Sequence, residues 1–461
     1  MSTGGRLPGL AGRWALLLLP AFAAGWPLFR PATLLLHLFV LSFFWLLLAF
    51  YRRETFGSWR ELGFLAALFA AMLGIGATLA RLLPAEPGVL PVPVAALLLT
   101  LLYNGRLAMT ATVTLSLVLA TLDGGLERAP LVYGLAGGVS GALVLRRVRR
   151  RSELYAGALA IAAALAGAAL VEGAQVRAPG TVLGAQAAIA AGLGLIQVAV
   201  AALLLPLAER ASGRTTDLTL LELADPTHPL LARLAHEAPG TWAHSLLVAN
   251  LAEAAANRIG ANGLLARVGG YFHDVGKLEA PELFAENFEG RSSPHAAMSP
   301  RESARRVRGH VDAGLALAAA ARLPAIVQQF IPEHHGTGML EYFVGELPAA
   351  ERLRAAADPD FRYAGPRPRS RETAVLMLAD AAEASVRVLD ERSPDRVRQV
   401  LAHLITQRLE AGQFDEAPVT ASDLARITEA FVPLLAGMHH ARPAYPRSAG
   451  GITSAFGRRQ G

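Results

Sequence analysis

The chain has 461 residues, of which 53% are hydrophobic, and its mean hydropathy of +0.37 is typical of a membrane protein. Its net positive charge comes from the first half. Residues 1–210 carry 16 arginines and 8 acidic residues, whereas residues 211–461 carry a net charge of −2. This distribution does not indicate a nucleic-acid groove, and the absence of cysteine excludes disulfides and thiolate ligands. The length suits two domains.

Eight apolar segments in the first half approach the length of about 17–25 residues that a membrane-spanning helix needs. The predicted spans are residues 14–29, 33–51, 61–83, 89–103, 106–121, 128–145, 153–174 and 182–206. The fourth and fifth segments are short and could instead form one span or a re-entrant pair, so the count is seven or eight. The first segment has the basic start of a signal peptide, but no clean cleavage site precedes the next span. We therefore predict a retained anchor.

The positions of the arginines predict the orientation of this domain in the membrane. With eight crossings, the N-terminus and everything after residue 206 lie on one side, and that side receives the arginine clusters at residues 6–13, 52–60 and 146–151. The positive-inside rule makes this side cytoplasmic. Ionisable residues are nearly absent within the spans, apart from His37, which argues against a transporter. We predict a multi-pass protein of the inner (cytoplasmic) membrane with its second half in the cytoplasm.

The second half has the apolar spacing of helices. Residues 246–255 are one example, proline and glycine punctuate the pattern, and continuous strand alternation is missing. The predicted fold class is therefore all-α. Its parts are a multi-spanning helical membrane domain (1–206), a juxtamembrane linker (207–216), an all-helical domain (217–445) and a disordered tail (446–461).

Seven residues of the second half have the chemistry of a two-metal site. They are His244, His273, Asp274, His310, His334, His335 and Asp380. Imidazoles and carboxylates suit Mn, Fe or Zn. Because adjacent helical residues point about 100° apart, we expect His334 and His335 to serve two neighbouring ions and the Asp274 carboxylate to bridge them. Seven ligands suit two ions, which could clamp the attacking and leaving oxygens of phosphoryl transfer.

Lys277 is the only lysine in the chain, and it ends the motif that begins at His273. A lysine that persists among 42 arginines suggests a site that needs a compact ammonium group, although chance survival is the alternative. We predict catalytic roles for Asp274 and Lys277, with phosphate contact as the role of the lysine. Predicted substrate contacts are Lys277, Asn287, Gly336 and Thr337, with a structural role as the alternative for Asn287.

For the other glutamates and histidines we predict supporting or structural roles. Glu333 and Glu383 are candidate acceptors for the second N–H of a ligating histidine. We expect the remaining histidines to be structural or to lack a partner, and these are His228, His236, His295, His403, His439 and His440.

At this point the chain resembles the HD hydrolase superfamily, and more closely the seven-transmembrane HD family of PgpH-type cyclic di-AMP phosphodiesterases. The resemblance runs through nearly all of 215–446 and includes residues 221–225, 237–241, 260–262, 333–338 and 378–380. It implies an HD-superfamily fold, the seven ligands named above, two divalent transition-metal ions (Mn or Fe) and hydrolysis of cyclic di-AMP to pApA. Family members typically carry a large extracytoplasmic domain after the first span, whereas only residues 30–32 separate the first two spans here.

The predicted function is thus a membrane-anchored cyclic di-AMP phosphodiesterase whose partners are a cyclic dinucleotide and the lipid bilayer, without DNA or RNA. A homodimer stays open. One alternative is an HD phosphohydrolase of another nucleotide such as cyclic di-GMP, since the preference for adenine rests on the resemblance alone. Another is a nucleotide-binding membrane receptor with little turnover.

Overall fold

The computed structural model describes residues 10–16, 18–25, 31–84, 86–145, 151–288 and 293–437. Contacts divide the chain into two compact units, residues 1–222 and 223–461. Within the described ranges the only extended pairing is one antiparallel bridge between Met339 and Arg362, so the predicted all-α fold is confirmed. The predicted tail (446–461) lies outside the described residues, as do Arg6, His439 and His440.

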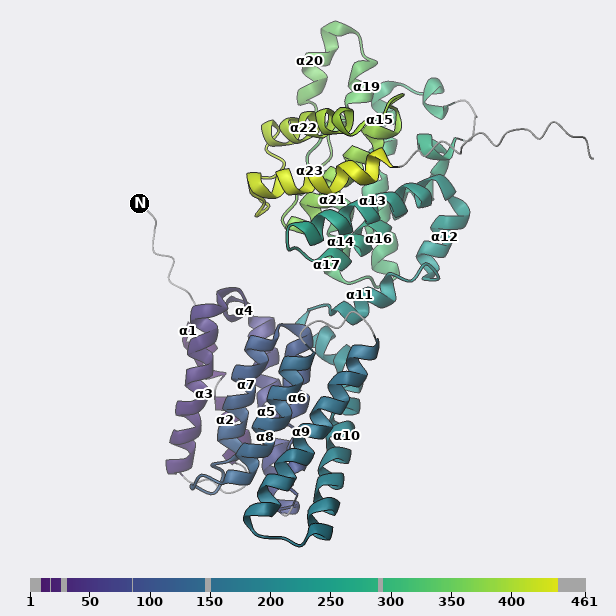
Figure 1. Ribbon diagram of the computed structural model, residues 1–461. Coiled ribbons are helices and arrows are strands. Elements are labelled where there is room, and N and C mark those ends of the chain that lie inside the picture. Colours follow the sequence, from purple (N-terminus) through teal and green to yellow (C-terminus); the bar gives the residue numbers. More distant parts are fainter. Residues whose placement is uncertain are drawn as a thin grey trace, which may run out of the picture. The chain divides into compact units, whose positions relative to one another are not determined.

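The first unit is a bundle of apolar helices that run side by side (Figure 1). Its helices are α1 (Leu10–Ala15), α2 (Leu18–Gly25), α3 (Pro31–Tyr51), α4 (Arg53–Gly57), α5 (Trp59–Leu82), η1 (Pro87–Val89), α6 (Val92–Leu102), α7 (Gly105–Leu119), α8 (Arg128–Val144), α9 (Arg151–Gln175) and α10 (Gly180–Ser212). Among the described helices, α3, α5, α9 and α10 are each long and apolar enough to cross a membrane.

The described part of the first predicted span consists of α1, which ends at Ala15, and α2, which begins at Leu18. Residue 17 and residues 26–30 lie outside the described residues. Pro20 lies in the first turn of α2, where its missing N–H is best tolerated.

The two short segments predicted at 89–103 and 106–121 form two separate helices, α6 and α7. Asn104 divides them, because its side-chain Oδ1 accepts a hydrogen bond from the Leu107 backbone N–H (3.0 Å) and caps α7. Ten of the eleven residues of α6 are buried, so this helix lies inside the bundle. Eleven residues rise about 16 Å, which is short of the roughly 30 Å hydrocarbon core.

The last membrane helix continues past its predicted end. α10 runs to Ser212, so the first part of the predicted linker (207–216) is helical, and Gly213 ends the helix at φ +76°. Pro206 lies within α10.

The second unit is a globular helical domain that follows α11 (Asp217–Leu223). Its elements are α12 (Pro229–Glu237), α13 (Pro239–Arg258), α14 (Gly263–Phe272), η2 (Val275–Glu279), η3 (Pro281–Leu283), η4 (Ala285–Asn287), η5 (Pro294–Ala297), α15 (Pro300–Arg308), α16 (His310–Ala320), α17 (Ala325–Gln328), α18 (Phe330–Glu333), α19 (Glu341–Gly345), α20 (Ala349–Ala357), η6 (Pro359–Phe361), α21 (Arg371–Arg387), α22 (Pro394–Glu410) and α23 (Ala421–Ala436).

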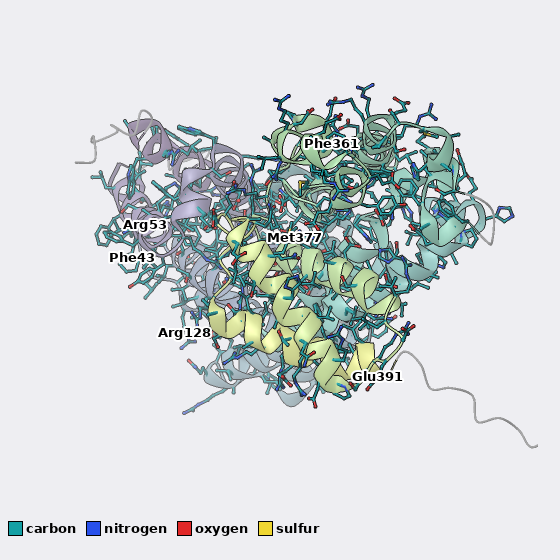
Figure 2. All side chains as sticks on the ribbon, turned by 90° about the horizontal axis from the view of Figure 1, so that it is seen from above. Phe43, Arg53, Arg128, Phe361, Met377 and Glu391 are labelled. Atoms are coloured by element: carbon teal, nitrogen blue, oxygen red, sulfur yellow. The ribbon has the colours of Figure 1, made fainter. Side chains whose placement is uncertain are left out.

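Helix α13 is central to this domain, because it packs against α14, α21 and α23 (Figure 1). Buried side chains on these helices include Val248 on α13, Phe272 on α14 and Val375 on α21. Met377, labelled in Figure 2, is also buried in α21. Burial of such a side chain stabilises a fold by about 1.5–3 kcal/mol, so this core holds α13, α14 and α21 as a rigid frame.

Candidate metal centre

The core helices place the predicted ligands at their ends and on their inner faces. His244 lies on α13 and Asp380 on α21, while His273 and Asp274 follow directly after α14. The next turn, η2, packs against the start of α16, where His310 lies.

A glycine makes this last contact possible. A Cβ atom on Gly276 would lie only 1.8 Å from the carbonyl oxygen of His310, a distance that no side chain can occupy. The glycine of the motif that runs from His273 to Lys277 therefore lets two backbones touch, and this contact brings Asp274 beside His310.

All seven predicted ligands come together, in two neighbouring groups of buried or partly buried donors. One group contains Asp274, His310, His334 and His335, and the other contains His244, His273 and Asp380. Within each group, one donor atom per residue lies within 4.8 Å of the others.

The carboxylate of Asp274 faces both groups. Its Oδ1 lies 3.5 Å from Nε2 of His310 and 3.6 Å from Nε2 of His334. Its Oδ2 lies 3.2 Å from Nε2 of His273 and 3.6 Å from Nε2 of His244. One oxygen is thus directed to each group, which is the arrangement expected of a carboxylate that bridges two ions.

Four of the histidines use their Nδ1 atoms to hold the ring in place. The acceptors are the carboxylate of Glu383 for His244 (2.7 Å), and the backbone oxygens of Gly270 for His273 (2.8 Å), Val307 for His310 (2.6 Å) and Phe330 for His334 (3.1 Å). A neutral ring that donates from Nδ1 keeps a lone pair on Nε2, which is the form that binds metals.

The Nε2 atoms of these rings fit this requirement. Among the described residues, several buried polar atoms have no hydrogen-bond partner. They include Oδ1 of Asp274 and the Nε2 atoms of His244, His273, His310 and His334. Nε2 of His244 does lie 3.1 Å from Oδ1 of Asp380, but without hydrogen-bond geometry. An unpaired buried polar atom costs about 1–3 kcal/mol. Five such atoms at one point suit divalent metal ions, which would satisfy them together.

Electrostatics distinguishes His244 from the three histidines of the first group. Burial lowers the pKa of His310 and lowers that of His334 to about 3, and it also holds the pKa of His335 well below its ordinary value. Burial acts against the charge of His244 as well, but its contacts with Asp380 and Glu383 raise the pKa of that ring to about 10. The first group therefore has neutral imidazoles ready for a metal, whereas a metal at the second group must displace a proton from His244.

Lys277 supports the bridging carboxylate. Its Nζ lies 2.8 Å from Oδ2 of Asp274 and 2.7 Å from Oε1 of Glu286. Burial opposes the charge of Asp274, but the neighbouring charges of His273 and Lys277 hold the pKa of that carboxyl well below its usual range. The lysine therefore keeps Asp274 ionised and directed at both donor groups.

Comparisons with known families agree with this geometry. Residues 30–216 match the family model of a 7TM receptor with intracellular HD hydrolase, and residues 241–385 match the HD domain. The chain is similar to seven-transmembrane HD proteins over both of its halves. Its second unit therefore contains an HD domain, and the predicted resemblance is confirmed.

Two curated relatives are both named cyclic-di-AMP phosphodiesterase PgpH. The protein of Bacillus subtilis is 32% identical over 367 residues, which cover 78% of this chain and 51% of the relative. The protein of Listeria monocytogenes is 30% identical over 361 residues, with 77% and 50% covered. The chain thus spans about half the length of the curated relatives it matches. A crystal structure of the L. monocytogenes PgpH HD domain in complex with cyclic di-AMP is 35% identical and has a TM-score of 0.44, with 47% of this chain and all of that chain covered.

One prediction about the HD-domain ligands differs from the structure. His334 and His335 were expected to serve two different ions, but their donor atoms lie in the same group. The expectation assumed a continuous helix, whereas α18 ends at Glu333 and a turn follows it. In that turn the two rings lie 3.8 Å apart, centre to centre, so both reach one side of Asp274.

The predicted substrate residues of the HD domain have partners within the domain. Asn287 bonds both the backbone N–H and the hydroxyl of Thr241 (3.1 and 2.9 Å), so it fastens η4 to the start of α13. Gln413 accepts from the Thr337 backbone N–H and donates to the Thr337 hydroxyl (3.0 and 2.9 Å). Gly336, at φ +53°, makes this turn possible.

The glutamates and histidines outside the predicted ligand set also have defined contacts in the structure. Glu383 accepts from a ligating histidine as expected, whereas Glu333 accepts from the backbone N–H of Arg369 instead. His228 caps α12, and Nε2 of His295 donates to the carbonyl of Leu283 and so orders a loop.

Three contributors to the site were not expected from the sequence, namely Glu286, Tyr363 and Gln413. Tyr363 stacks on the His335 ring at 3.9 Å between centroids and 19° between planes. It is placed there by the antiparallel bridge of Met339 with Arg362, which joins segments more than twenty residues apart. No local sequence pattern predicts such a contact. The one available signal was chemical, since a buried Lys277 requires an acidic partner within reach.

Proposed function

We propose that this protein is a membrane-anchored, metal-dependent phosphodiesterase that hydrolyses cyclic di-AMP to the linear dinucleotide pApA and so controls the level of that second messenger. The observation that carries the proposal is the Asp274 carboxylate, which directs one oxygen to each of two groups of buried donors. The substrate is taken from the names of the two curated relatives.

The proposed ligands are the seven residues of the two donor groups. Two bound divalent ions, Mn or Fe, would supply Lewis-acid charge for the phosphoryl oxygens and would activate water as the nucleophile. The protein's own part is to hold these donors rigidly and to keep them in the correct protonation state. Glu383 orients His244, and backbone carbonyls orient His273, His310 and His334.

Lys277 is proposed to contact a phosphate oxygen of the substrate. An ammonium group has three donors, of which Asp274 and Glu286 engage two. The third can be directed to a phosphate group that approaches Asp274. The backbone of Gly336 and Thr337, held by Gln413, is proposed to line the same approach, because it follows His334 and His335 directly in the chain.

We also propose the location. The arginine-rich ends of the membrane helices face the cytoplasm by the positive-inside rule, and with the eight crossings predicted from the sequence the HD domain lies on that same side of the inner membrane. Residues 217–445 are the proposed catalytic region.

The test is hydrolysis by the purified full chain in detergent with Mn²⁺, given cyclic di-AMP and cyclic di-GMP in separate reactions, with products separated by chromatography. We expect conversion of cyclic di-AMP to pApA, and its loss in His273→Ala and Asp380→Ala. If only cyclic di-GMP were converted, the substrate would be cyclic di-GMP and not cyclic di-AMP. Stable binding of nucleotide with no turnover, in protein that holds metal, would indicate a receptor instead.

A further inference from the structure

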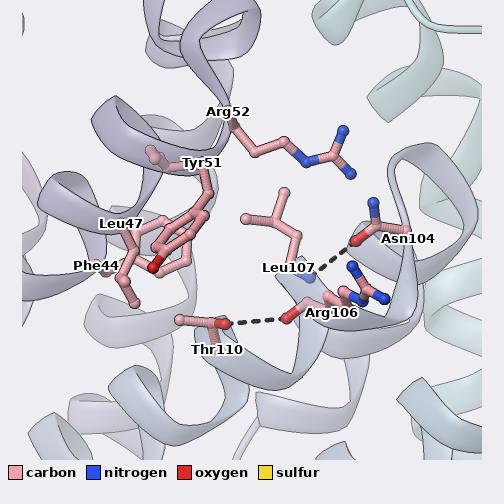
Figure 3. Close-up of a pocket in the computed structure, with 9 residues that line it drawn as sticks. Phe44, Leu47, Tyr51, Arg52, Asn104, Arg106, Leu107 and Thr110 are labelled. Carbon is pink, nitrogen blue, oxygen red and sulfur yellow. Dashed lines mark hydrogen bonds between the residues drawn. The ribbon is translucent and has the colours of Figure 1, made fainter.

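The first unit has a cavity of about 600 Å³ at the arginine-rich end of the bundle, between the end of α3 and the start of α7 (Figure 3). Its polar lining comes from Tyr51, Arg52, Asn104 and Arg106, and its apolar lining includes Phe44 and Leu107. None of the lining residues is acidic. The cavity therefore has a net positive charge on one wall and an apolar surface beside it.

The two guanidinium groups of this cavity have no ion-pair partner among the described residues. For the part of the chain that the structure describes, no ion pair is found for Arg52 or Arg106, although ion pairs are common elsewhere, as between Arg214 and Glu61 (2.9 Å). The side chains of Arg52, Asn104 and Arg106 lie on the same side of the cavity, across from Tyr51 (Figure 3). Since Oδ1 of Asn104 is occupied by the Leu107 backbone N–H, the amide nitrogen is the group left for a ligand.

A second cavity, of about 450 Å³, continues along the same two helices. It shares Thr110 with the first cavity and is lined otherwise by apolar or hydroxyl side chains, which include Phe39, Phe43, Val113 and Leu117. Phe39 and Phe43 are 72% and 60% exposed, and Figure 2 shows Phe43 at the edge of the first unit. The two cavities together form one groove on the outside of the bundle, charged at its end and apolar along its length.

The dimensions of the groove match one leaflet of a bilayer. Arg106 and Leu117 are eleven residues apart on one helix, which corresponds to about 16 Å. Half of the hydrocarbon core measures roughly 15 Å. An acyl chain that starts at the two arginines would therefore follow α3 and α7 to the middle of the membrane.

We infer that this groove between α3 and α7 binds an anionic phospholipid of the cytoplasmic leaflet, with its phosphate between Arg52 and Arg106 and one acyl chain against Phe43 and Val113. Guanidinium groups pair with phosphate oxygens through two parallel hydrogen bonds, and Tyr51 is the kind of aromatic residue that marks the membrane interface. The negative charge of the cytoplasmic leaflet supplies such lipids on the side where these arginines are predicted to lie.

The experiment measures lipid retention by native mass spectrometry. The full chain in detergent is titrated with phosphatidylglycerol or phosphatidylcholine of the same acyl chains, with and without inorganic phosphate. Each arginine near an anionic lipid strengthens binding about fivefold, so Arg52→Gln with Arg106→Gln should weaken phosphatidylglycerol binding about 25-fold. The matched control is Arg53→Gln with Arg210→Gln. It removes the same charge from two exposed arginines outside the groove and should retain the lipid as the unaltered chain does.

A second variant tests the apolar part. Val113→Trp fills the groove and leaves both arginines in place, so it should reduce retention of long-chain phosphatidylglycerol without affecting a six-carbon analogue. Thermal melting of each variant verifies the fold. The inference is overturned if the unaltered chain retains both lipids equally, if the double arginine variant binds like its control, or if Val113→Trp changes nothing. It is also overturned if inorganic phosphate displaces the lipid, because the site would then belong to a soluble anion. None of these readouts depends on hydrolysis.

Discussion

Removal of the Glu383 carboxylate should weaken metal binding at one of the two donor groups and spare the other. Glu383 is buried, and its Oε2 accepts from Nδ1 of His244 at 2.7 Å, whereas it has no such contact with His310, His334 or His335. Loss of a carboxylate that orients a ligating histidine costs about 10–100-fold in metal affinity, which corresponds to about 1.4–2.8 kcal/mol. Glu383→Gln keeps an acceptor oxygen and should lie near the lower limit. Glu383→Ala leaves the Nδ1–H unpaired and should lie near the upper one.

The assay is a titration of the metal-free full chain with Mn²⁺, followed by calorimetry, with Glu351→Gln as a control for an exposed carboxylate. We expect two binding events in the unaltered chain, of which only one weakens in the Glu383 variants. Binding at pH 8 should also release close to one proton, because the pKa of His244 is raised to about 10 in the metal-free protein. Equal weakening of both events, or no change in either, would refute the assignment of Glu383 to one group.

Three further predictions test the frame around this site. Asp274→Asn should reduce hydrolysis by on the order of 10²–10³-fold and abolish binding of the second ion, as measured by turnover and by metal content; retention of two tightly bound ions would contradict the bridging role. Gly276→Ala should destabilise the HD domain by more than about 1–3 kcal/mol, because its Cβ would lie 1.8 Å from a backbone oxygen of α16. Gly345→Ala has open space around it and should melt like the unaltered chain. Gln413→Ala should cost about 1–3 kcal/mol in denaturant unfolding, since it leaves the half-buried turn at Thr337 without the buried partner that holds it; an unchanged midpoint would show that this turn is held by other contacts.

The residues that the sequence singles out as a site lie close together in the structure, and most of them belong to short motifs. The adjacent pairs His273-Asp274 and His334-His335, together with single residues on α13, α16 and α21, all reach one point in the structure. Buried histidines and carboxylates that would be costly when unpaired can be recognised without coordinates. The membrane helices were predicted on similar grounds, since their apolar length is a property of composition.

What the sequence could not predict depends on contacts between distant segments. The distribution of His334 and His335 between the ions depends on where α18 ends, and the stacking of Tyr363 on His335 depends on a bridge to a remote segment. For Asn287 the sequence leaves a substrate contact and a structural role open, and its hydrogen bonds to the start of α13 become visible only in the fold. In each case tertiary packing decides the role, and local residue type does not.

The central claim is that the buried cluster holds two ions that act together on a phosphodiester. The most direct measurement is the metal content per chain of the purified protein, determined alongside its hydrolysis of cyclic di-AMP as Mn²⁺ is added back to the metal-free form. We predict that hydrolysis appears as occupancy rises toward two ions per chain, and that Asp274→Asn fails to reach it. Full hydrolysis in a chain that holds no more than trace metal would contradict the account.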